Sequence, residues 1–368
     1  MVFGLSLVGL ILFVVGLFIV AADFSAWDFR NNLWGPAHLT WRGQSPYAVH
    51  RLFPDGSNAI WLPQAVGIFV PLGLLPLREA SNAWLLVNIS GLAVLNWHLL
   101  KRANGVNPEP GHLGIVLLAS ALFLPTIQHF ILGQIDLLII LSLVFGSRFI
   151  ETRQLLPAAA LYAFGLTKPQ LCIVVLPMIL SYLISKQQFS QGLNLIGSIM
   201  VTGLIMTIPL WMADTVWWRD LMANLRRNPQ WEQPSTWWLV QSHVGSPVLA
   251  LGIVGALLAG SILLALDICK KAGPVPGTVW GLALTTVAGT YLWSWDFVLL
   301  LPLFIDTAAR ARRPAGIIGL ATVWLGVFVF GLLSLQPGPA SNARLWWLPY
   351  WVFFGLALCR RWVRSAER

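Results

Sequence analysis

The sequence predicts an all-α, polytopic membrane protein with about twelve transmembrane or re-entrant helices. Of its 368 residues, 57% are hydrophobic and only 10% are charged, whereas soluble domains carry about 25% charged residues. Several apolar runs approach or exceed the roughly 18 residues that cross a bilayer. Together these observations predict a single integral membrane domain over residues 1–368.

The first apolar segment, residues 3–22, begins the chain. A signal peptide is the alternative, because Ala21 and Ala22 offer small residues near a possible cleavage point. However, no lysine or arginine precedes the segment, which is also long for the apolar region of a signal peptide. The sequence therefore favours a retained first helix.

Further apolar segments follow, separated by polar breaks. They span residues 80–100, 112–127, 132–149, 154–166, 170–185, 192–211, 246–268, 278–292, 294–308, 315–335 and 345–359. Four of them are short for a membrane crossing, and we expect these to be broken, tilted or re-entrant. The four are residues 154–166, 170–185, 278–292 and 294–308.

Two longer polar stretches interrupt this series, at residues 23–79 and 212–245, and both are predicted to be outer loops. Within the first, residues 60–77 are apolar but contain Pro63, Pro71 and Pro76. Proline removes a backbone donor and interrupts regular helix. We therefore expect a pair of short helices there, at the outer face or re-entrant.

The charges orient this layout. With the N-terminus inside, the inner face carries fourteen lysines and arginines against five acids, and nine of each remain for the outer side. Basic residues gather on the cytoplasmic side of membrane proteins. The net charge of +9 is thus explained by topology and implies no nucleic-acid binding. We expect a multi-pass protein of the plasma (cytoplasmic) membrane.

Residues 23–58 are unusually rich in ionisable and aromatic groups. They contain three aspartates, three arginines, two histidines and three tryptophans. A membrane anchor has no need of such a loop, so we expect chemistry or recognition at this face. Asp23 and Asp28 are five residues apart and do not share a helical face, which argues against a carboxylate dyad. Either could instead be solvated or paired with Arg30.

Four polar patches converge on the outer side in this topology. The first outer loop supplies Asp28, Arg30 and the turn Gly43–Tyr47, and the second supplies Arg226 and Arg227. His129, Gln134 and Asp136 lie at the break between the third and fourth segments, and Lys168 interrupts an apolar stretch. Asp296 follows Trp295 at the start of the tenth segment and is grouped with Arg226 and Arg227 of the second outer loop.

Lys168 is the most informative single residue. Both flanking segments carry inner-face lysine or arginine at their other ends, so Lys168 must lie at an outer turn or within the membrane. A cation in the membrane is costly and indicates function. Snorkelling to the interface is the plainer alternative. The favoured interpretation is a partner for a lipid phosphate, which supplies charge and hydrogen bonds.

The remaining polar residues have plain structural alternatives. For Asp136 and Asp296 the alternative is a hydrogen bond or an ion pair at a helix mouth. His129 is not expected to bind metal, because no second histidine or cysteine stands at ligand spacing. The sequence contains no Walker loop, dinucleotide fingerprint or GxSxG elbow. We therefore expect neither a metal nor a cofactor.

Several motifs in order give the chain a resemblance to a known family. Four motifs follow one another along the chain: Asp28-Phe29 with Gly43–Tyr47, the proline-rich stretch 53–76, Gly133-Gln134, and Thr167-Lys168-Pro169. Trp295-Asp296-Phe297 is a weaker fifth match. This pattern resembles glycosyltransferase family 87, the GT-C mannosyltransferases that use polyprenyl-phosphate sugars. Asp136 departs from it, since asparagine is usual there, and Asp296-Phe297 replace the paired histidines of some members.

The resemblance implies a GT-C-like fold and an inverting transfer of a hexose, mannose first, from a polyprenyl-phosphate donor to a lipid or glycan acceptor at the outer face. It also implies that Asp28, in the first outer loop, is the general base. Such chemistry needs a carboxylate for the acceptor proton and cations for the leaving phosphate. Lys168 and one or more of Arg30, Arg226 and Arg227 could supply the cations, and Tyr47, His129, Gln134, Asp136 and Asp296 are further candidates for substrate binding.

Two other classes of function remain open from the sequence. A secondary transporter or lipid flippase would suit the helices and buried charges, but such proteins usually carry internal repeats, whereas here the polar motifs concentrate in residues 1–180. A non-catalytic membrane partner or polymer-handling protein is the third class. A transferase should gather Asp28, Lys168 and an outer arginine around one site, whereas a charged path through the midplane would favour transport.

Overall fold

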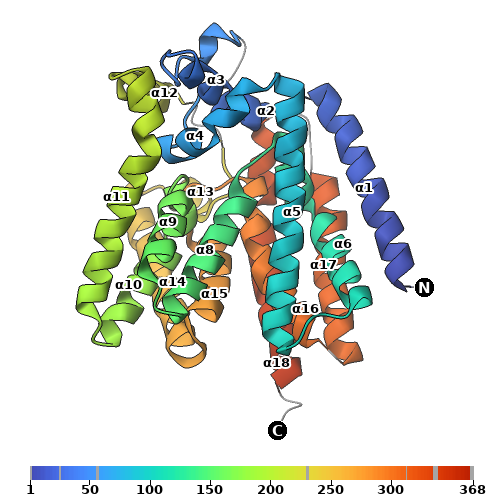
Figure 1. Ribbon diagram of the computed structural model, residues 1–368. Coiled ribbons are helices and arrows are strands. Elements are labelled where there is room, and N and C mark those ends of the chain that lie inside the picture. Colours follow the sequence, from blue (N-terminus) through green and yellow to red (C-terminus); the bar gives the residue numbers. More distant parts are fainter. Residues whose placement is uncertain are drawn as a thin grey trace.

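The computed structural model describes residues 2–24, 26–54, 58–228, 232–311, 313–334 and 339–364, and every regular element within these ranges is helical. Long helices stand side by side along one direction, and short helices cover one end of them (Figure 1). We call this the α3 end, after the short helix α3 (Gly35–Trp41), and the other the opposite end.

The α3 end is built from the segment after the first helix. Following α1 (Val2–Phe24), the chain forms a series of short helical elements. They are α2 (Trp27–Phe29), the π turn η1 (Arg30–Trp34), α3, η2 (Val49–Arg51), α4 (Pro63–Phe69) and η3 (Val70–Leu74). Pro63 begins α4 and Pro71 lies at the start of η3, where proline's missing N–H costs no helical bond. Residues 60–77 thus form two short helices, as expected from their prolines.

Most of the remaining elements overlap the predicted apolar segments, and two further helices lie within the predicted loop 212–245. In chain order, the remaining elements are α5 (Leu77–Asn104), α6 (Pro110–Ala121), α7 (Leu124–Leu132), α8 (Asp136–Glu151), α9 (Leu155–Gly165), η4 (Pro169–Cys172), α10 (Val175–Ser185), α11 (Phe189–Ala213), α12 (Trp217–Arg227), α13 (Thr236–Val244), α14 (Pro247–Ala272), α15 (Pro274–Ala288), η5 (Ser294–Leu300), α16 (Leu301–Arg310), α17 (Pro314–Ser334), η6 (Pro339–Leu345) and α18 (Leu348–Arg364).

Four helices in the described ranges are long and apolar enough to cross a membrane: α5, α11, α14 and α17. Helices α6 and α7 together would make a fifth crossing, but they bend by 67° at their junction. Pro125 lies in the first turn of α7 and interrupts the segment that the sequence predicts as continuous over 112–127. The protein is therefore a helical membrane protein, while the count of twelve segments stays a prediction.

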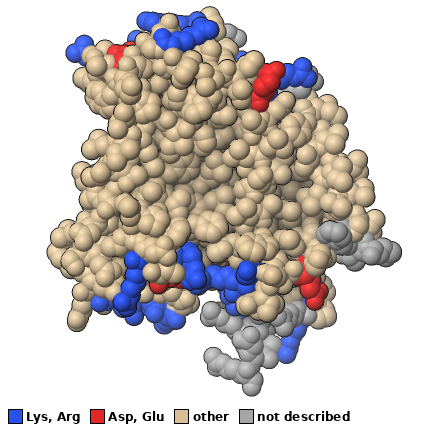
Figure 2. Space-filling view, viewed as in Figure 1, with Lys and Arg blue, Asp and Glu red and all other residues tan. Residues whose placement is uncertain are grey.

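Charges and exposed apolar side chains agree with a membrane environment. Lysines, arginines and acids gather at both ends, and the belt between them is nearly free of charge on the face shown in Figure 2. Apolar side chains of the long helices point outward from this belt, for example Leu204 (65% exposed) and Ile318 (64% exposed). Such exposure is expected where the solvent is lipid.

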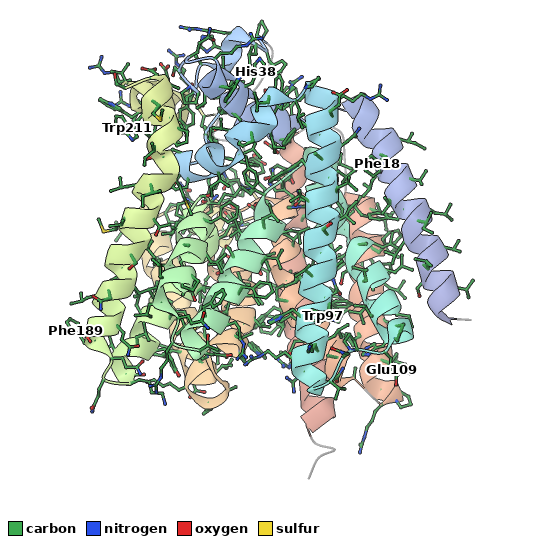
Figure 3. All side chains as sticks on the ribbon, viewed as in Figure 1. Phe18, His38, Trp97, Glu109, Phe189 and Trp211 are labelled. Atoms are coloured by element: carbon green, nitrogen blue, oxygen red, sulfur yellow. The ribbon has the colours of Figure 1, made fainter. Side chains whose placement is uncertain are left out.

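Labelled side chains mark the two ends of the molecule. His38 and Trp211 lie at the α3 end, whereas Phe189 and Glu109 lie at the opposite end (Figure 3). At that opposite end, Glu151 of α8 accepts from Arg102 of α5 at 2.8 Å and from the backbone N–H of Val275 at the start of α15 at 3.1 Å. This carboxylate therefore ties three helix ends together.

Candidate functional site

Chain breaks bring the polar residues of the middle segments together. Helix α7 ends at Gly133, which has a left-handed φ of 68°, and α8 begins directly afterwards at Asp136. The indole of Trp84 donates a hydrogen bond of 2.9 Å to the Gly133 carbonyl and fixes this junction. Lys168 lies at the matching junction between α9 and η4, and Asp296 lies in η5.

Lys168 is the centre of the site. Its ammonium donates to Asp136 Oδ1 at 2.6 Å, to Gln134 Oε1 at 2.7 Å and to Asp296 Oδ1 at 3.2 Å. An ammonium has three N–H donors, so these contacts use all of them. The side chain is only 8% exposed and its ammonium lies 5.4 Å from the ring centre of Trp61. The snorkelling alternative is therefore wrong for Lys168, because its charge is held inside the protein.

Asp28 joins this cluster through Gln134. The amide nitrogen of Gln134 donates to Asp28 Oδ2 at 2.6 Å, while the amide oxygen accepts from Lys168. Asn32, one helical turn after Asp28, donates to the other carboxylate oxygen at 3.1 Å. Asp28 therefore reaches the site from the first loop, and its two oxygens keep further lone pairs for a substrate.

The surroundings of Asp28 make its carboxyl group less acidic than that of an ordinary aspartate. Burial raises the pKa of Asp28 from 3.8 to about 6, and the nearby Asp136 carboxylate adds to the rise. Lys168 and the hydrogen bonds from Gln134 and Asn32 lower the same pKa, but by less than the rise. A carboxyl group with a pKa near 6 accepts a proton more readily than an ordinary aspartate and is still ionised at neutral pH.

His129 lies behind the cluster. Its Nε2 is 3.0 Å from Asn88 Oδ1, and the amide nitrogen of Asn88 donates to the Trp84 carbonyl. Asn88 therefore offers an acceptor, which assigns the imidazole proton to Nε2 and leaves Nδ1 facing Asp136 Oδ2 at 3.8 Å. His129 is fully buried, and the 3.8 Å between Nδ1 and Asp136 Oδ2 is too long for a hydrogen bond. His129 therefore packs beside Asp136, and its hydrogen bond is to Asn88.

Asp296 combines two structural roles that the sequence left open. One carboxylate oxygen accepts from Lys168, and the other accepts from the backbone N–H of Trp293 at 2.8 Å. The first is an ion pair, and the second is a hydrogen bond at the start of η5. Asp296 is fully buried, so both contacts help to compensate its charge.

Tyr47 supports the cluster from a second layer. It is buried, and its hydroxyl donates to the Trp61 carbonyl at 2.9 Å. Trp61 in turn places its ring beside Lys168. Tyr47 therefore fixes the residue that covers Lys168.

Arg30 lies in the same loop in a different setting. Its guanidinium carbon is 4.5 Å from the ring centres of both Trp27 and Phe53. Nε and Nη2 are buried and have no hydrogen-bond partner among the residues that the structure describes. Buried donors are normally satisfied, so Arg30 has free capacity to bind an anion.

Arg226 and Arg227 are not part of the cluster. They lie exposed at the end of α12, and no contact joins them to Lys168 or Asp28 within the described residues. Trp231, which the sequence places in the same loop, lies outside those residues. The structure thus unites Asp28, Gln134, Asp136, Lys168, Asp296 and His129, brings Tyr47 close through Trp61, and separates the two arginines of α12.

Three members of the site could not be singled out from the sequence argument. Asn32 follows Asp28 by four residues, a signal that becomes useful only if a helical turn is assumed there. Asn88 is a polar residue inside the apolar α5, and such residues in spanning helices point to partners. Trp61 carries no distinguishing pattern among the 20 tryptophans.

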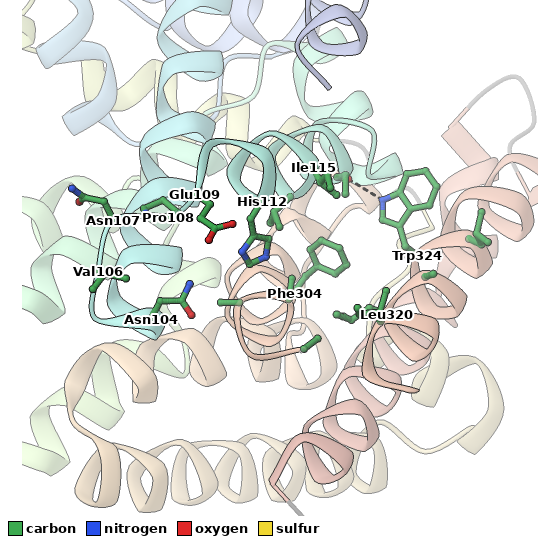
Figure 4. A pocket seen from close by; sticks show the side chains of 18 residues that line it. Asn104, Val106, Asn107, Pro108, Glu109, His112, Ile115, Phe304, Leu320 and Trp324 are labelled. Carbon is green, nitrogen blue, oxygen red and sulfur yellow. Dashed lines mark hydrogen bonds between the residues drawn. The ribbon is translucent and has the colours of Figure 1, made fainter. Parts of the chain in front are cut away.

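Two large cavities lie away from this cluster. One of about 910 Å³ is lined at the opposite end by residues that include Asn104, Glu109, His112 and Phe304, with Trp324 donating to the Ala119 carbonyl at 2.8 Å beside it (Figure 4). The other, of about 810 Å³, is an apolar space between α17 and α18. Neither is lined by a predicted site residue. Within the described residues, no three histidine, cysteine or carboxylate side chains group as metal ligands.

The fold and the site define a helical membrane protein with a buried carboxylate–lysine centre where several chain breaks meet. The sequence model of glycosyltransferase family 87 matches residues 60–294. The chain belongs to glycosyltransferase family 87 and is a membrane glycosyltransferase, as the motif resemblance predicted. A comparison with curated proteins gives no match.

The extent of the family match separates the site residues. Gln134, Asp136 and Lys168 fall inside it, as do Arg226 and Arg227. Asp28 precedes it and Asp296 follows it by two residues. Because the family is one of glycosyltransferases, the protein acts on a sugar donor and an acceptor. The family therefore favours the transferase over the transporter considered from the sequence.

Proposed function

We propose that the protein transfers a hexose, with mannose as the first candidate, from a polyprenyl-phosphate donor to a lipid or glycan hydroxyl at the outer face of the plasma membrane. The observation that carries this proposal is the placement of Asp28. A loop carboxylate with a raised pKa is joined through one amide to a buried lysine in a membrane glycosyltransferase. This arrangement suits a general base close to a cation.

The proposed reaction is a single displacement with inversion. The acceptor oxygen attacks the anomeric carbon of the sugar, and the bond from that carbon to the phosphate oxygen breaks. Asp28 takes the hydroxyl proton of the acceptor, and the electron pair of the broken bond remains on the polyprenyl phosphate. The products are the glycosylated acceptor and the free lipid phosphate.

Two cations are proposed to bind the phosphate. Lys168 can do so by exchanging its longest contact, 3.2 Å to Asp296, for a phosphate oxygen. Arg30 needs no exchange, because two of its guanidinium nitrogens lack partners among the described residues. A guanidinium and a phosphate form strong charge-assisted hydrogen bonds. Arg226 and Arg227 are left out of this step, because no contact among the described residues joins them to Lys168 or Asp28.

The proposed role of Gln134, Asp136 and Asp296 is to fix the positions of the Lys168 ammonium and the Asp28 carboxylate. Gln134 bonds both of them, and the two aspartates hold the ammonium from its other sides. Tyr47 acts one layer further out, on Trp61, and His129 fills the space beside Asp136. In this arrangement Asp28 and the lysine face the substrates, and the others position them.

The test is the variant Asp28→Asn in membranes reconstituted with a panel of polyprenyl-phosphate sugars and lipid extracts. We expect transfer to fall by about 10²–10⁴-fold, the usual contribution of a general base. Glu79→Gln is the matched control, because Glu79 is an exposed carboxylate in the first turn of α5 and should be dispensable. Near-normal turnover of Asp28→Asn would remove Asp28 from the role of base.

A further inference from the structure

Helix α12 presents an amphipathic surface that its own chain leaves uncovered. Trp217, Leu221 and Asn224 form its buried side. Asn224 donates to the Tyr47 carbonyl at 2.9 Å and to the Ala59 carbonyl at 3.0 Å. The hydroxyl of Ser45 donates to Asp220. The helix is thus fastened to the first loop by one face.

A second face of α12 is apolar and open. Trp218, Met222 and Leu225 are spaced by four and three residues, so they lie on one side of the helix. Their exposed fractions are 45%, 45% and 41%. At the adjoining end of α11, Trp211 (44%) and Met212 (82%) are exposed as well. Exposed apolar side chains in this number mark a contact surface.

A basic stripe borders this apolar face. Arg219 and Arg226 are seven residues apart and therefore lie on one side of α12, next to Met222. Arg227 adds a third positive charge, and Asp220, the single acid in the helix, is engaged by Ser45. The exposed charge of α12 is therefore positive.

The position of α12 identifies the occupant of this surface. The helix begins three residues after α11, one of the helices that is long and apolar enough to cross a membrane. Figure 1 places α12 at the α3 end of α11, where the charge-free belt of Figure 2 gives way to charged residues. A helix at this level with an apolar face and arginines beside it meets the headgroup region of the bilayer.

We propose that α12 lies in the membrane interface, with Trp218, Met222 and Leu225 among the acyl chains and Arg219 and Arg226 bound to anionic phospholipid headgroups. Lipid phosphate complements the arginine stripe, and the acyl region removes the apolar side chains from water. Because α12 also holds Ser45, Tyr47 and Ala59, this contact anchors the first loop to the membrane. The inference does not depend on which sugar or acceptor the protein uses.

The full chain with Met222→Cys carries a spin label for the test. The native cysteines Cys172, Cys269 and Cys359 are all buried, so the introduced thiol is labelled selectively. The protein is reconstituted in phosphatidylcholine vesicles with and without phosphatidylglycerol. Collisions of the label with oxygen, which prefers lipid, and with a nickel chelate, which stays in water, report its depth. Ala223→Cys is the matched position, because residue 223 lies beside Arg219 and Arg227 on the polar side.

We expect the label at residue 222 to favour oxygen and the label at residue 223 to favour the nickel chelate. Phosphatidylglycerol should shift residue 222 further toward oxygen, and Arg219→Gln/Arg226→Gln should remove most of that shift, because each arginine contributes to the attraction of anionic headgroups. The control Arg42→Gln/Arg51→Gln removes the same charge from exposed positions in the first loop and should preserve the shift.

Three results would overturn the proposal. The first is equal access of the nickel chelate to both labels, which would place α12 in water. The second is a phosphatidylglycerol shift that survives loss of both arginines. The third is dipolar broadening between labels, which would show that a second copy of the chain covers this face.

Discussion

At the scale of single residues, the ionisation of Asp28 has the most direct consequence. Burial raises the pKa of this carboxyl to about 6, so a large fraction is protonated in mildly acidic solution and unable to accept another proton. Ionisation is nearly complete about one unit above that value. A base with this pKa retains proton affinity close to neutral pH.

We therefore expect kcat/KM for the donor, which reports the ionisation of the free enzyme, to rise with pH, to reach half of its maximum near pH 6 and to level off above it. The sign follows from the active form, which is the carboxylate. Initial rates between mildly acidic and neutral pH measure the curve. A profile that is flat through this range in an enzyme that stays folded would exclude Asp28 as the titrating base.

Lys168 links function to stability. Its removal leaves Asp136 and Asp296 buried without their cation. Breaking one partner out of a buried pair typically costs about 3–5 kcal/mol, whereas exposed pairs contribute about 0–1 kcal/mol. The buried and the exposed lysine–aspartate pair of this protein differ little in length, 2.6 Å for Lys168–Asp136 and 2.7 Å for Lys271–Asp267.

We expect Lys168→Ala to lower thermal stability strongly and Lys271→Ala to leave it nearly unchanged. Adding Asp136→Asn to Lys168→Ala should restore part of the loss, because one uncompensated charge is removed. Thermal unfolding in detergent measures all three, and donor affinity is then compared at a temperature where each is folded. Equal stability losses for the two lysine variants would contradict the buried network.

At the scale of elements, Gly133 controls where Asp28 meets the helices. Its φ of 68° is left-handed, and an added Cβ would lie 2.6 Å from Phe29 Cβ and 2.8 Å from Ala26 Cβ. Both neighbours belong to the turn that carries Asp28. The backbone conformation and the close approach therefore each favour glycine at this position.

We expect Gly133→Ala to push α2 away from α7 and to weaken the bond from Gln134 to Asp28, with activity falling more than stability. Gly105→Ala is the control, because Gly105 has a φ of 74° but open space where its Cβ would lie. It should cost about 1–2 kcal/mol of backbone strain without loss of turnover. Similar activity for the two variants would show that the approach of Phe29 is not required.

Sequence reasoning succeeds for elements whose signal is local. Hydrophobic length locates the helices, and the prolines of residues 60–77 indicate two short ones. It fails where packing decides, as at the 67° bend between α6 and α7 and at the π turn over Arg30–Trp34. Lys168, Asp136 and Asp28 can be singled out because charges are rare in apolar sequence. Their hydrogen bonds could not be foreseen, since they join residues up to 128 positions apart.

At the scale of the whole molecule, the two charged ends predict a fixed orientation in the membrane. The α3 end is expected outside, because the opposite end carries the excess of lysine and arginine. His50 lies exposed in the first loop, and Lys271 lies exposed in the last turn of α14. The buried native cysteines provide a silent background for labelling.

We expect a membrane-impermeant maleimide to label His50→Cys in intact cells and Lys271→Cys only after permeabilisation. The reason is that basic segments are retained on the cytoplasmic side during insertion. Labelling of both variants after permeabilisation controls for reactivity. The reverse pattern would invert the predicted topology and with it the outer-face location of the site.

The amide of Gln134 gives the two oxygens of Asp28 different duties in the proposed reaction. Its N–H donors face Oδ2, and its carbonyl is committed to Lys168, so the amide cannot turn round to accept a proton from the carboxyl. A proton arriving at Oδ2 would oppose that N–H, whereas Oδ1 has only the longer bond from Asn32. One carboxylate oxygen is thus structural and the other chemical. If Asp28 is the base as proposed, the acceptor would deliver its proton to Oδ1, the oxygen that Asn32 contacts, and would therefore approach from the Asn32 side.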